Sequence, residues 1–166
     1  MLEQYPDGTL FVDLFGGSGL LSHIAKSLKP HSTVIYNDFD NYRFRMKHIP
    51  QTNQLLADIR EMVGNSVPRH KIIKGELRER ILSRIEQEEN TTGYVDFITL
   101  SSSILFSMKY KLSVQDMRKE ALYNNIRKTG YPECADYLEG LEIVSCDYKE
   151  VFNRYKDIPG VVFLVD

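Results

Sequence analysis

A glycine-rich turn between an apolar strand and an apolar helix constrains the fold of this chain most. Residues 9–14 (TLFVDL) are apolar and favour a strand, and residues 16–19 (GGSG) form the turn that follows. Apolar side chains then recur at helical spacing over residues 20–28, until Pro30 forbids continuation of a helix. Residues 33–36 (TVIY) form a second apolar run. Strand, turn, helix and strand make a βαβ unit, so we predict an α/β fold with parallel strands.

The middle of the chain differs in character from its two ends. Residues 66–84 and 109–131 each carry six Lys or Arg against two acidic residues, although the whole chain has a net charge of −2. Further strands are predicted at residues 141–146 and in the last seven residues, GVVFLVD, which we expect to be fully buried. Helices are predicted between the second apolar run and residue 141, at residues 42–47, 53–63, 74–89, 94–108, 114–127 and 131–138.

These patterns divide the chain into three parts. Residues 1–65 are predicted to be the first part of an α/β domain, and residues 66–140 a helical, basic insert. Residues 141–166 are predicted to return to the α/β domain. A short helix within this last part is expected to begin after Asp147.

Composition excludes several classes of protein. No apolar run approaches the roughly 18 residues of a membrane-spanning helix, and the N-terminus lacks an apolar signal core, so we expect a cytoplasmic protein. The two cysteines, Cys134 and Cys146, lie 12 residues apart with no histidine at ligand spacing. This pattern fits neither a disulfide framework nor a zinc site. We therefore expect buried, inert thiols and no metal.

The glycine turn and the acidic residues near it predict a site for a nucleoside cofactor. Glycines at a strand-to-helix turn let a ligand approach the backbone, and the helix N-terminus offers N–H donors. Asp38, at the end of the second strand, can accept both hydroxyls of a ribose. Asp13 would repel a pyrophosphate but could pair with an ammonium group, which favours S-adenosylmethionine over a dinucleotide. The pattern Gly17-x-Gly19-x-x-Ser22 is a dinucleotide fingerprint with serine in place of its third glycine.

Structural roles for the same residues remain open. The turn could be a tight strand-to-helix connection without a ligand. Asp38 could cap the helix predicted at residues 42–47, and for Asp40 we expect that capping role in preference to a contact with a ligand. Asp147 could simply cap the helix that follows it. The basic stretches could be solvated helix faces.

The motifs resemble those of S-adenosylmethionine-dependent DNA amino-methyltransferases, and their order resembles the DNA adenine methylase (Dam-like) family. Asp13-Leu-Phe15-Gly-Gly17-Ser-Gly19 matches the D-x-F-x-G-x-G motif, and Asn37-Asp38-Phe39-Asp40 resembles the acidic second motif. Ser145-Cys-Asp147-Tyr148 resembles a short G-D-F segment. The resemblance implies a Rossmann-like class I methyltransferase sheet with a helical target-recognition insert. It also implies a set of residues that contact S-adenosylmethionine: Asp13, Phe15, Gly17, Gly19, Asp38, Phe39 and Asp147.

Asp166 takes the place of the first letter of the family's catalytic D-P-P-Y motif. It follows Asp147 by 19 residues, close to the family's spacing between these motifs. The resemblance implies that Asp166 and a proline carbonyl accept the hydrogens of adenine N6, while the tyrosine stacks on the flipped base. The sequence contains neither Pro-Pro-Tyr nor the family's K-x-x-G-G-K motif before the glycine turn. We therefore expect a truncated piece whose 166 residues alone have negligible activity.

The basic insert is predicted to contact the phosphates of double-stranded DNA. The residues predicted for this role are Arg78, Lys109, Lys111, Arg118, Arg127 and Lys128. A restriction-modification or phage context would suit such an enzyme. Three other functions remain open: a methyltransferase for RNA or a small molecule, a dinucleotide-binding oxidoreductase, and a non-catalytic cofactor- or DNA-binding module.

Overall fold

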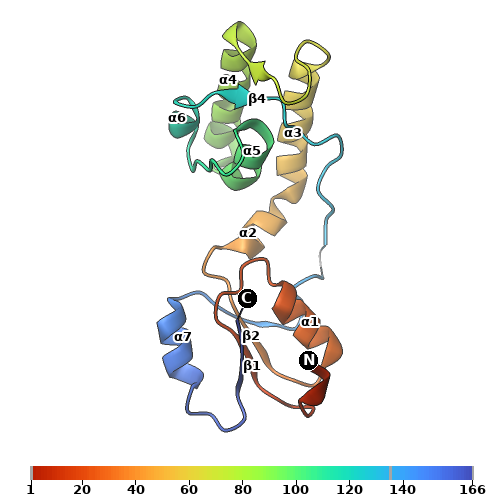
Figure 1. Cartoon of the computed structure of the whole chain (residues 1–166), viewed down its shortest axis with the longest axis vertical. Helices are drawn as coiled ribbons and strands as arrows, with labels where there is room; N and C mark the ends of the chain where they lie inside the picture. The colour runs from red at the N-terminus through yellow and green to blue at the C-terminus, as the bar shows by residue number, and fades with distance from the viewer. Residues whose placement is uncertain (1, 135, 166) are drawn as a thin grey trace. The chain divides into compact units, whose positions relative to one another are not determined.

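The computed structural model describes residues 2–134 and 136–165, which form two compact units. The sheet unit contains the residues up to Lys47 and those from Cys134 onward, and the helical unit runs from His48 to Glu133 (Figure 1). Each unit has a hydrophobic core of its own. A separate core is the usual property of a domain, and we describe the two units one after the other.

Four parallel strands form the centre of the sheet unit. They lie in the order β5-β2-β1-β6, and Val12 of β1 is paired with Ile35 of β2 and Phe163 of β6. In chain order this is 3-2-1-4, the strand order of a Rossmann-like fold, so the predicted α/β fold is confirmed. The bounds of the strands are Phe11–Asp13 for β1, Val34–Asn37 for β2, Glu142–Val144 for β5 and Val162–Leu164 for β6.

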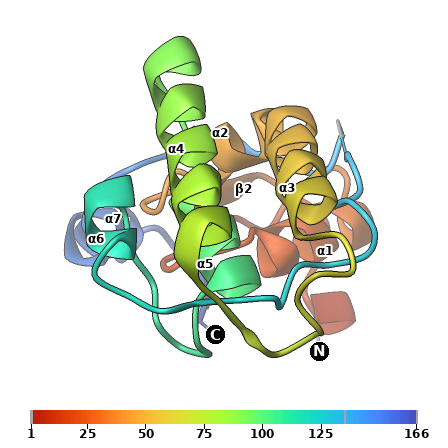
Figure 2. The same cartoon turned by 90° about the horizontal axis from the view of Figure 1, so that it is seen from above.

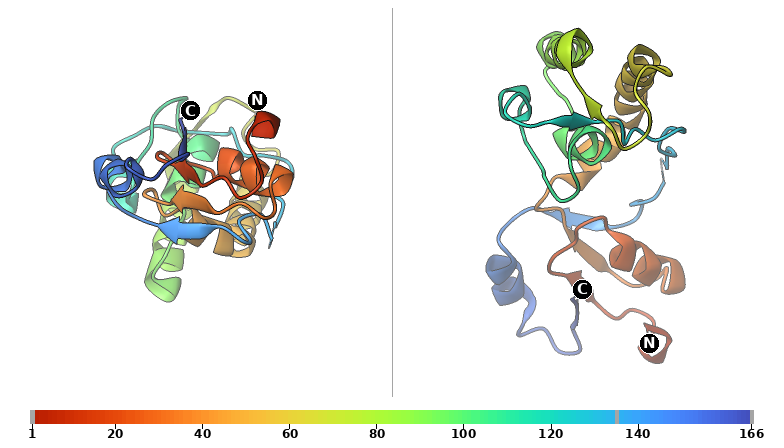
Figure 3. Two further views of the ribbon diagram at one scale, coloured as in Figure 1. Left: turned by 90° about the horizontal axis from the view of Figure 1, so that it is seen from below. Right: turned by 45° about the horizontal axis from the view of Figure 1, so that its top comes forward.

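Helices cover both faces of this sheet (Figure 3). Successive residues of a strand point to opposite faces, so Phe11 packs with α1 (Leu20–Leu28), whereas Val12 packs with α7 (Tyr148–Tyr155). The short 3₁₀ helix η1 (Leu2–Gln4) contacts α1. The remaining helix of the unit, α2 (Tyr42–Lys47), follows β2. The sheet is therefore the middle of three layers.

The helical unit is built around the packing of α3 (Ile49–Val63) against α4 (Gly75–Thr92), as Figure 2 shows. The other elements of this unit are α5 (Phe97–Ile104), α6 (Val114–Met117), β3 (Ile72–Ile73) and β4 (Leu122–Tyr123). Strands β3 and β4 pair in antiparallel fashion. The buried side chains of α3 recur every three or four residues, which gives the helix one apolar face: Leu55, Leu56, Ile59 and Val63.

The boundaries between the units differ from those predicted from the sequence. The predicted boundaries follow residues 65 and 140, whereas the compact units meet after Lys47 and Glu133. The reason is that the apolar face of α3 packs in the core of the helical unit. Pro50 lies in the first turn of α3, where a missing N–H removes no helical hydrogen bond. The proline therefore marks the start of a helix in the structure.

Two of the predicted helices are wrong. The helix predicted at residues 114–127 ends at Met117, because residues 122–123 pair with β3 and their backbone groups are taken by a strand ladder. Of the residues predicted to be helical at 131–138, the described ones contain turns and extended backbone. Pro132 cannot donate a backbone hydrogen bond, and it disfavours helical backbone for the residue before it.

The burial of the last strand and of the two cysteines also differs from prediction. Within β6 only Leu164 is buried, and the following Val165 is 63% exposed, because β6 pairs with β1 alone in the described sheet. Cys134 is exposed and Cys146 is half-buried, so the prediction that both thiols are buried is wrong. Among the helices that the structure describes, none is long and apolar enough to cross a membrane.

Candidate functional site

The carboxyl ends of β1 and β2 bring the two predicted cofactor motifs together. The glycine turn follows β1, and Asp38 follows β2. β1 has β2 on one side and β6 on the other, so the strand order reverses at β1. In open α/β sheets, ligands bind outside the carboxyl ends of the strands at such a reversal. The topology therefore places the glycine turn where this class of sheet binds its ligands.

Close packing and a positive φ explain two of the glycines in the turn. Gly16 has a φ of +38°, and a Cβ there would lie 2.1 Å from the Asn37 carbonyl oxygen. Gly19 has a φ of +74°, and its Cβ would lie 2.5 Å from a side-chain carbon of Leu138. The atom close to Gly16 belongs to the backbone and cannot move aside, so packing requires glycine there. The atom close to Gly19 is the end of a leucine side chain, and it is the positive φ that favours glycine at that position. Sequence reasoning assigned Gly19 to the cofactor and did not single out Gly16.

The turn lines an open hollow on the surface of the sheet unit. A Cβ added at Gly17 would have the Phe15 carbonyl oxygen, 3.7 Å away, as its nearest neighbour, so the backbone is approachable there. The space is about 400 Å³ when the part open to solvent is included. Its lining comes from β1, the turn and the start of α1: Asp13, Phe15, Gly16, Gly17, Ser18, Leu20 and Leu21. A hollow with exposed backbone and a few polar groups suits part of a small ligand.

Asp13 is buried and holds the turn in shape. Its Oδ1 accepts a hydrogen bond from the Gly16 N–H at 2.9 Å, and its Oδ2 accepts one from the Ser22 hydroxyl at 2.7 Å. Ser22, which stands in place of a third glycine, is therefore the partner of this carboxylate. The predicted pairing of Asp13 with a ligand ammonium would be an additional contact of a carboxylate that already has these two donors.

Asp38 caps the helix that follows it. Its Oδ1 accepts a hydrogen bond from the Tyr42 N–H at 2.6 Å, and its Oδ2 accepts a longer one from the Arg43 N–H at 3.3 Å. The expectation that Asp40 makes this cap is wrong, because these N–H groups of the first turn of α2 point to Asp38. Asp38 is only 6% exposed, and a contact with ribose hydroxyls remains a prediction.

Asn37 ties three strand ends together and was not identified as a site residue from the sequence. Its side-chain N–H group donates to the carbonyl oxygens of Leu14 and Cys146, each at 2.9 Å. Its carbonyl oxygen accepts from the Cys146 N–H at 3.2 Å. The side chain is buried; Leu14 directly follows β1, and Cys146 lies two positions after the end of β5. Asn37 thus fixes the spacing of the strand ends that carry the site.

Exposed aromatic side chains lie beside the turn. The rings of Phe15 and Tyr148 are 5.1 Å apart, and both are more than a third exposed. Phe39, after β2, is 64% exposed. Asp147 caps α7 by accepting from the Lys149 N–H at 2.8 Å, as its structural alternative predicted. Asp166 lies outside the described residues, two positions beyond the end of β6.

Most of the cations predicted to contact DNA are paired with acids of the helical unit. Lys109 and Lys111 lie 2.6 Å and 3.0 Å from the two oxygens of Glu120. The hydrogen bonds from these two lysines hold the pKa of Glu120 below its usual value. Arg118 reaches Glu79 and Glu86, at 3.0 Å and 2.9 Å. Arg78 pairs with Glu79 and also donates to the Arg118 carbonyl oxygen. Each of these four cations is therefore paired with an acidic side chain of the same unit.

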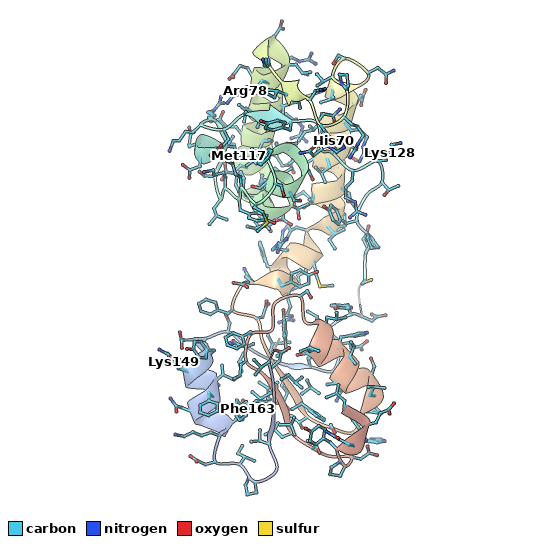
Figure 4. The ribbon with its side chains drawn as sticks, viewed as in Figure 1. His70, Arg78, Met117, Lys128, Lys149 and Phe163 are labelled. Carbon is cyan, nitrogen blue, oxygen red and sulfur yellow. The ribbon has the colours of Figure 1, made fainter. Side chains whose placement is uncertain are left out.

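The other two predicted cations, Arg127 and Lys128, are exposed and lie beside a second basic segment. The Arg69 side chain donates to the Ile126 carbonyl oxygen at 2.6 Å, and the Asn124 N–H donates to the Lys71 carbonyl oxygen at 2.9 Å. Figure 4 shows Lys128 and His70 in the same part of the helical unit. Arg69 and Lys71 are also exposed. We call the four residues Arg69, Lys71, Arg127 and Lys128 the open basic surface.

Comparison with known proteins adds one relative. A curated protein of Haemophilus influenzae, named "Putative methyltransferase", is 38% identical over 160 residues, which cover 96% of this chain and 53% of that protein. The chain therefore spans about half the length of this relative. No family model matches the sequence, and no solved structure matches it.

Proposed function

We propose that this chain is the cofactor-binding and target-recognition part of a DNA adenine-N6 methyltransferase. Similarity to a protein named as a methyltransferase, over 96% of the chain, supports a methyltransferase. One structural observation carries the proposal further. The central β1 of a 3-2-1-4 parallel sheet delivers the glycine turn to the point of strand reversal, and Asp38 stands at the end of the neighbouring strand.

The residues around the turn fit S-adenosylmethionine. When bound, this cofactor supplies an electrophilic methyl group on a sulfonium ion. Gly17 leaves the backbone open to a ligand, and Asp38 offers carboxylate oxygens to ribose hydroxyls. Phe15 and Tyr148 present exposed ring faces to an apolar or aromatic group. Asp13 keeps the turn in the shape that presents these groups.

For the second substrate, the proposal uses two parts of the chain. Asp166 is predicted to accept a hydrogen bond from adenine N6, which would aim the nitrogen lone pair at the methyl group. Of the six cations predicted to contact DNA, Lys109, Arg127 and Lys128 are exposed, and Lys109 is paired with Glu120, so Arg127 and Lys128 are the better candidates for phosphate contacts. We add Arg69 and Lys71, the other two residues of the open basic surface, because their hydrogen bonds with Ile126 and Asn124 bring them beside Arg127 and Lys128.

Calorimetry with S-adenosylmethionine and with NAD tests the cofactor. We expect binding of S-adenosylmethionine and none of NAD. Asp38→Ala should weaken binding by roughly 1.5–3 kcal/mol, the usual contribution of a hydrogen bond to a charged group. Asp40→Ala is the matched control, since that carboxylate is exposed and is expected to leave the affinity unchanged. Binding of NAD in preference to S-adenosylmethionine would favour the oxidoreductase and overturn the proposal.

The target is tested with labelled S-adenosylmethionine and duplex DNA. We expect the chain to bind the duplex with a strong dependence on salt, and to transfer negligible methyl label in the absence of Pro-Pro-Tyr after Asp166. Transfer to RNA or to a small molecule would point to one of the other methyltransferase functions. Duplex binding that does not change with salt would contradict the phosphate contacts.

A further inference from the structure

Tyr36 is a fully buried tyrosine directly beneath the glycine turn. None of its surface is exposed, and one ring carbon would lie 2.6 Å from a Cβ at Gly16 and 3.4 Å from one at Gly19. The ring therefore forms the floor on which the turn rests. A phenylalanine would fill the same space. A buried hydroxyl is costly unless it is hydrogen-bonded, so its partners indicate what the oxygen contributes.

The Tyr36 hydroxyl joins the two motifs of the site. It lies 2.8 Å from the Gly17 carbonyl oxygen and 3.2 Å from Oδ1 of Asp38. The hydroxyl has one proton, which these two acceptors share. Burial, followed by the negative charge of Asp38, raises the pKa of Tyr36. The group therefore remains a hydrogen-bond donor throughout the neutral range.

Holding the Gly17 carbonyl also orients the next backbone N–H. In a planar trans peptide, the carbonyl of one residue and the N–H of the next point in opposite directions. Because the Gly17 carbonyl points to Tyr36, the Ser18 N–H points away from the tyrosine. Gly17 and Ser18 both line the open hollow. The hydroxyl thus fixes the peptide that forms part of the wall of this hollow.

The same hydroxyl acts on the Asp38 carboxylate. Oδ1 accepts a hydrogen bond from the Tyr36 hydroxyl and a short one, at 2.6 Å, from the Tyr42 N–H. Oδ2 has the longer contact with the Arg43 N–H, at 3.3 Å. Two donors on Oδ1 hold the carboxylate in one rotation, with Oδ2 as the less committed acceptor. Oδ2 is therefore the oxygen better able to accept a hydrogen bond from a ligand.

We propose that Tyr36 is a positioning residue for the nucleoside ligand, acting through the Gly17 peptide and the Asp38 carboxylate. This inference rests on the proposed function, because it takes a ribonucleoside such as S-adenosylmethionine as the ligand. It adds a residue that contacts no ligand atom and sets the geometry of two groups that do. The consequence is selectivity, since only a ligand with ribose hydroxyls benefits from the oriented carboxylate.

The experiment compares Tyr36→Phe with the wild-type chain in calorimetric titrations with S-adenosylhomocysteine, a ligand that keeps the nucleoside and cannot react. The variant removes one oxygen and keeps the ring. We expect the affinity to fall roughly tenfold, the effect of losing one hydrogen bond to a charged group. Tyr5→Phe is the matched control, because Tyr5 packs on Phe11 in the same unit, and its affinity should match the wild type.

A second ligand separates positioning from general damage to the fold. The analogue of S-adenosylhomocysteine without a ribose 2′-hydroxyl should lose clearly less affinity on Tyr36→Phe than S-adenosylhomocysteine does, because only the part of the effect that passes through the Gly17 peptide remains. In an Asp38→Asn background, Tyr36→Phe should also lose most of its effect on the hydroxylated ligand. If Tyr36→Phe has a lower melting temperature than the wild type, titrations below that temperature still separate the two explanations. A general loss of structure would lower the affinities for both ligands equally.

The possible outcomes are distinct. Equal affinities of wild type and Tyr36→Phe for S-adenosylhomocysteine overturn the inference and leave the proposed function intact. An equal loss for both ligands also overturns it, because Tyr36 would then be a structural residue only. Failure of the folded wild type to bind any S-adenosyl ligand overturns the proposed function and the inference together.

Discussion

Polar residues at the strand ends of the sheet unit bond to backbone groups, whereas the cations of the helical unit bond mostly to acidic side chains. Asp13, Asn37 and Asp38 each hold a backbone segment next to the glycine turn. Lys109 and Lys111 converge instead on Glu120. Residues predicted from the sequence are therefore brought together in the first unit and largely neutralised in the second. Sheet topology dictates where strand ends meet, while nothing in a charge count says which charges will be paired.

The largest expected effect tests how rigidly the turn is held. Gly16→Ala places a Cβ against the Asn37 carbonyl oxygen and should lower the free energy of unfolding by about 3 kcal/mol. Gly17→Ala is the matched control: it shares a positive φ but has open space, and should cost about 1 kcal/mol. Urea unfolding followed by circular dichroism measures both. Equal losses would show that backbone conformation, and not the close approach, governs the turn.

A somewhat smaller effect is expected for the residue that ties the strand ends. Asn37→Ala leaves the Leu14 and Cys146 carbonyl groups without the Asn37 donor, and should cost about 2 kcal/mol of unfolding free energy. Asn153→Ala, on the exposed side of α7, should change stability by less than about 0.5 kcal/mol. The same unfolding measurement applies. A loss below 1 kcal/mol for Asn37→Ala would mean that water replaces its contacts.

The contrast between paired and exposed cations can be tested through the salt dependence of duplex binding. The double variant Arg127→Ser with Lys128→Ser should lower the slope of log affinity against log salt by about 2, since each phosphate contact contributes roughly 0.9. The matched double variant Lys109→Ser with Lys111→Ser should leave the slope nearly unchanged, because Glu120 already neutralises these lysines. A larger effect from the second pair would remove the distinction between the units.

The smallest effect concerns stability in alkali. Since the pKa of Tyr36 is raised in the folded chain, its contribution to stability is complete below the usual tyrosine value of 10.0 and is lost as pH rises toward the folded value. Wild type should therefore lose about 1.4 kcal/mol per pH unit above that point through this residue. Tyr36→Phe should lack this part of the loss, and Tyr5→Phe should retain it. Urea unfolding at a series of alkaline pH values measures the difference.

Much of the sheet unit could be predicted because its signals are local. Strand residues, the turn and the helix after it have different periodicities, and Asp147 begins a helix as its residue type suggests. Asn37 was missed as a site residue because its partners are distant in sequence. Tyr36 was missed because a tyrosine near the end of an apolar strand resembles an ordinary core residue, and its Gly17 partner lies 19 residues away. The only available signal was the polar group of each at a strand end.

The helical unit was harder to predict because tertiary contacts decide its details. Strands β3 and β4 have two residues each, too few for a pattern, and they form through pairing across about 50 residues of chain. Nothing in the sequence around Glu120 indicated that it would form ion pairs with two lysines. The charge pattern also gave no sign that Arg127 would be exposed with its guanidinium over the Tyr131 ring, 4.3 Å from the ring centre.

The chain leaves the sheet after β2 and returns at β5, and these two strands are hydrogen-bonded neighbours. In the chain, the entire helical unit is therefore part of the crossover connection that joins two neighbouring parallel strands. Its interior sequence can change without altering a single strand register, provided that its ends still meet the sheet. A lineage built on this plan could exchange one helical unit for another while keeping its sheet, and a protein engineer could do the same at Lys47 and Cys134.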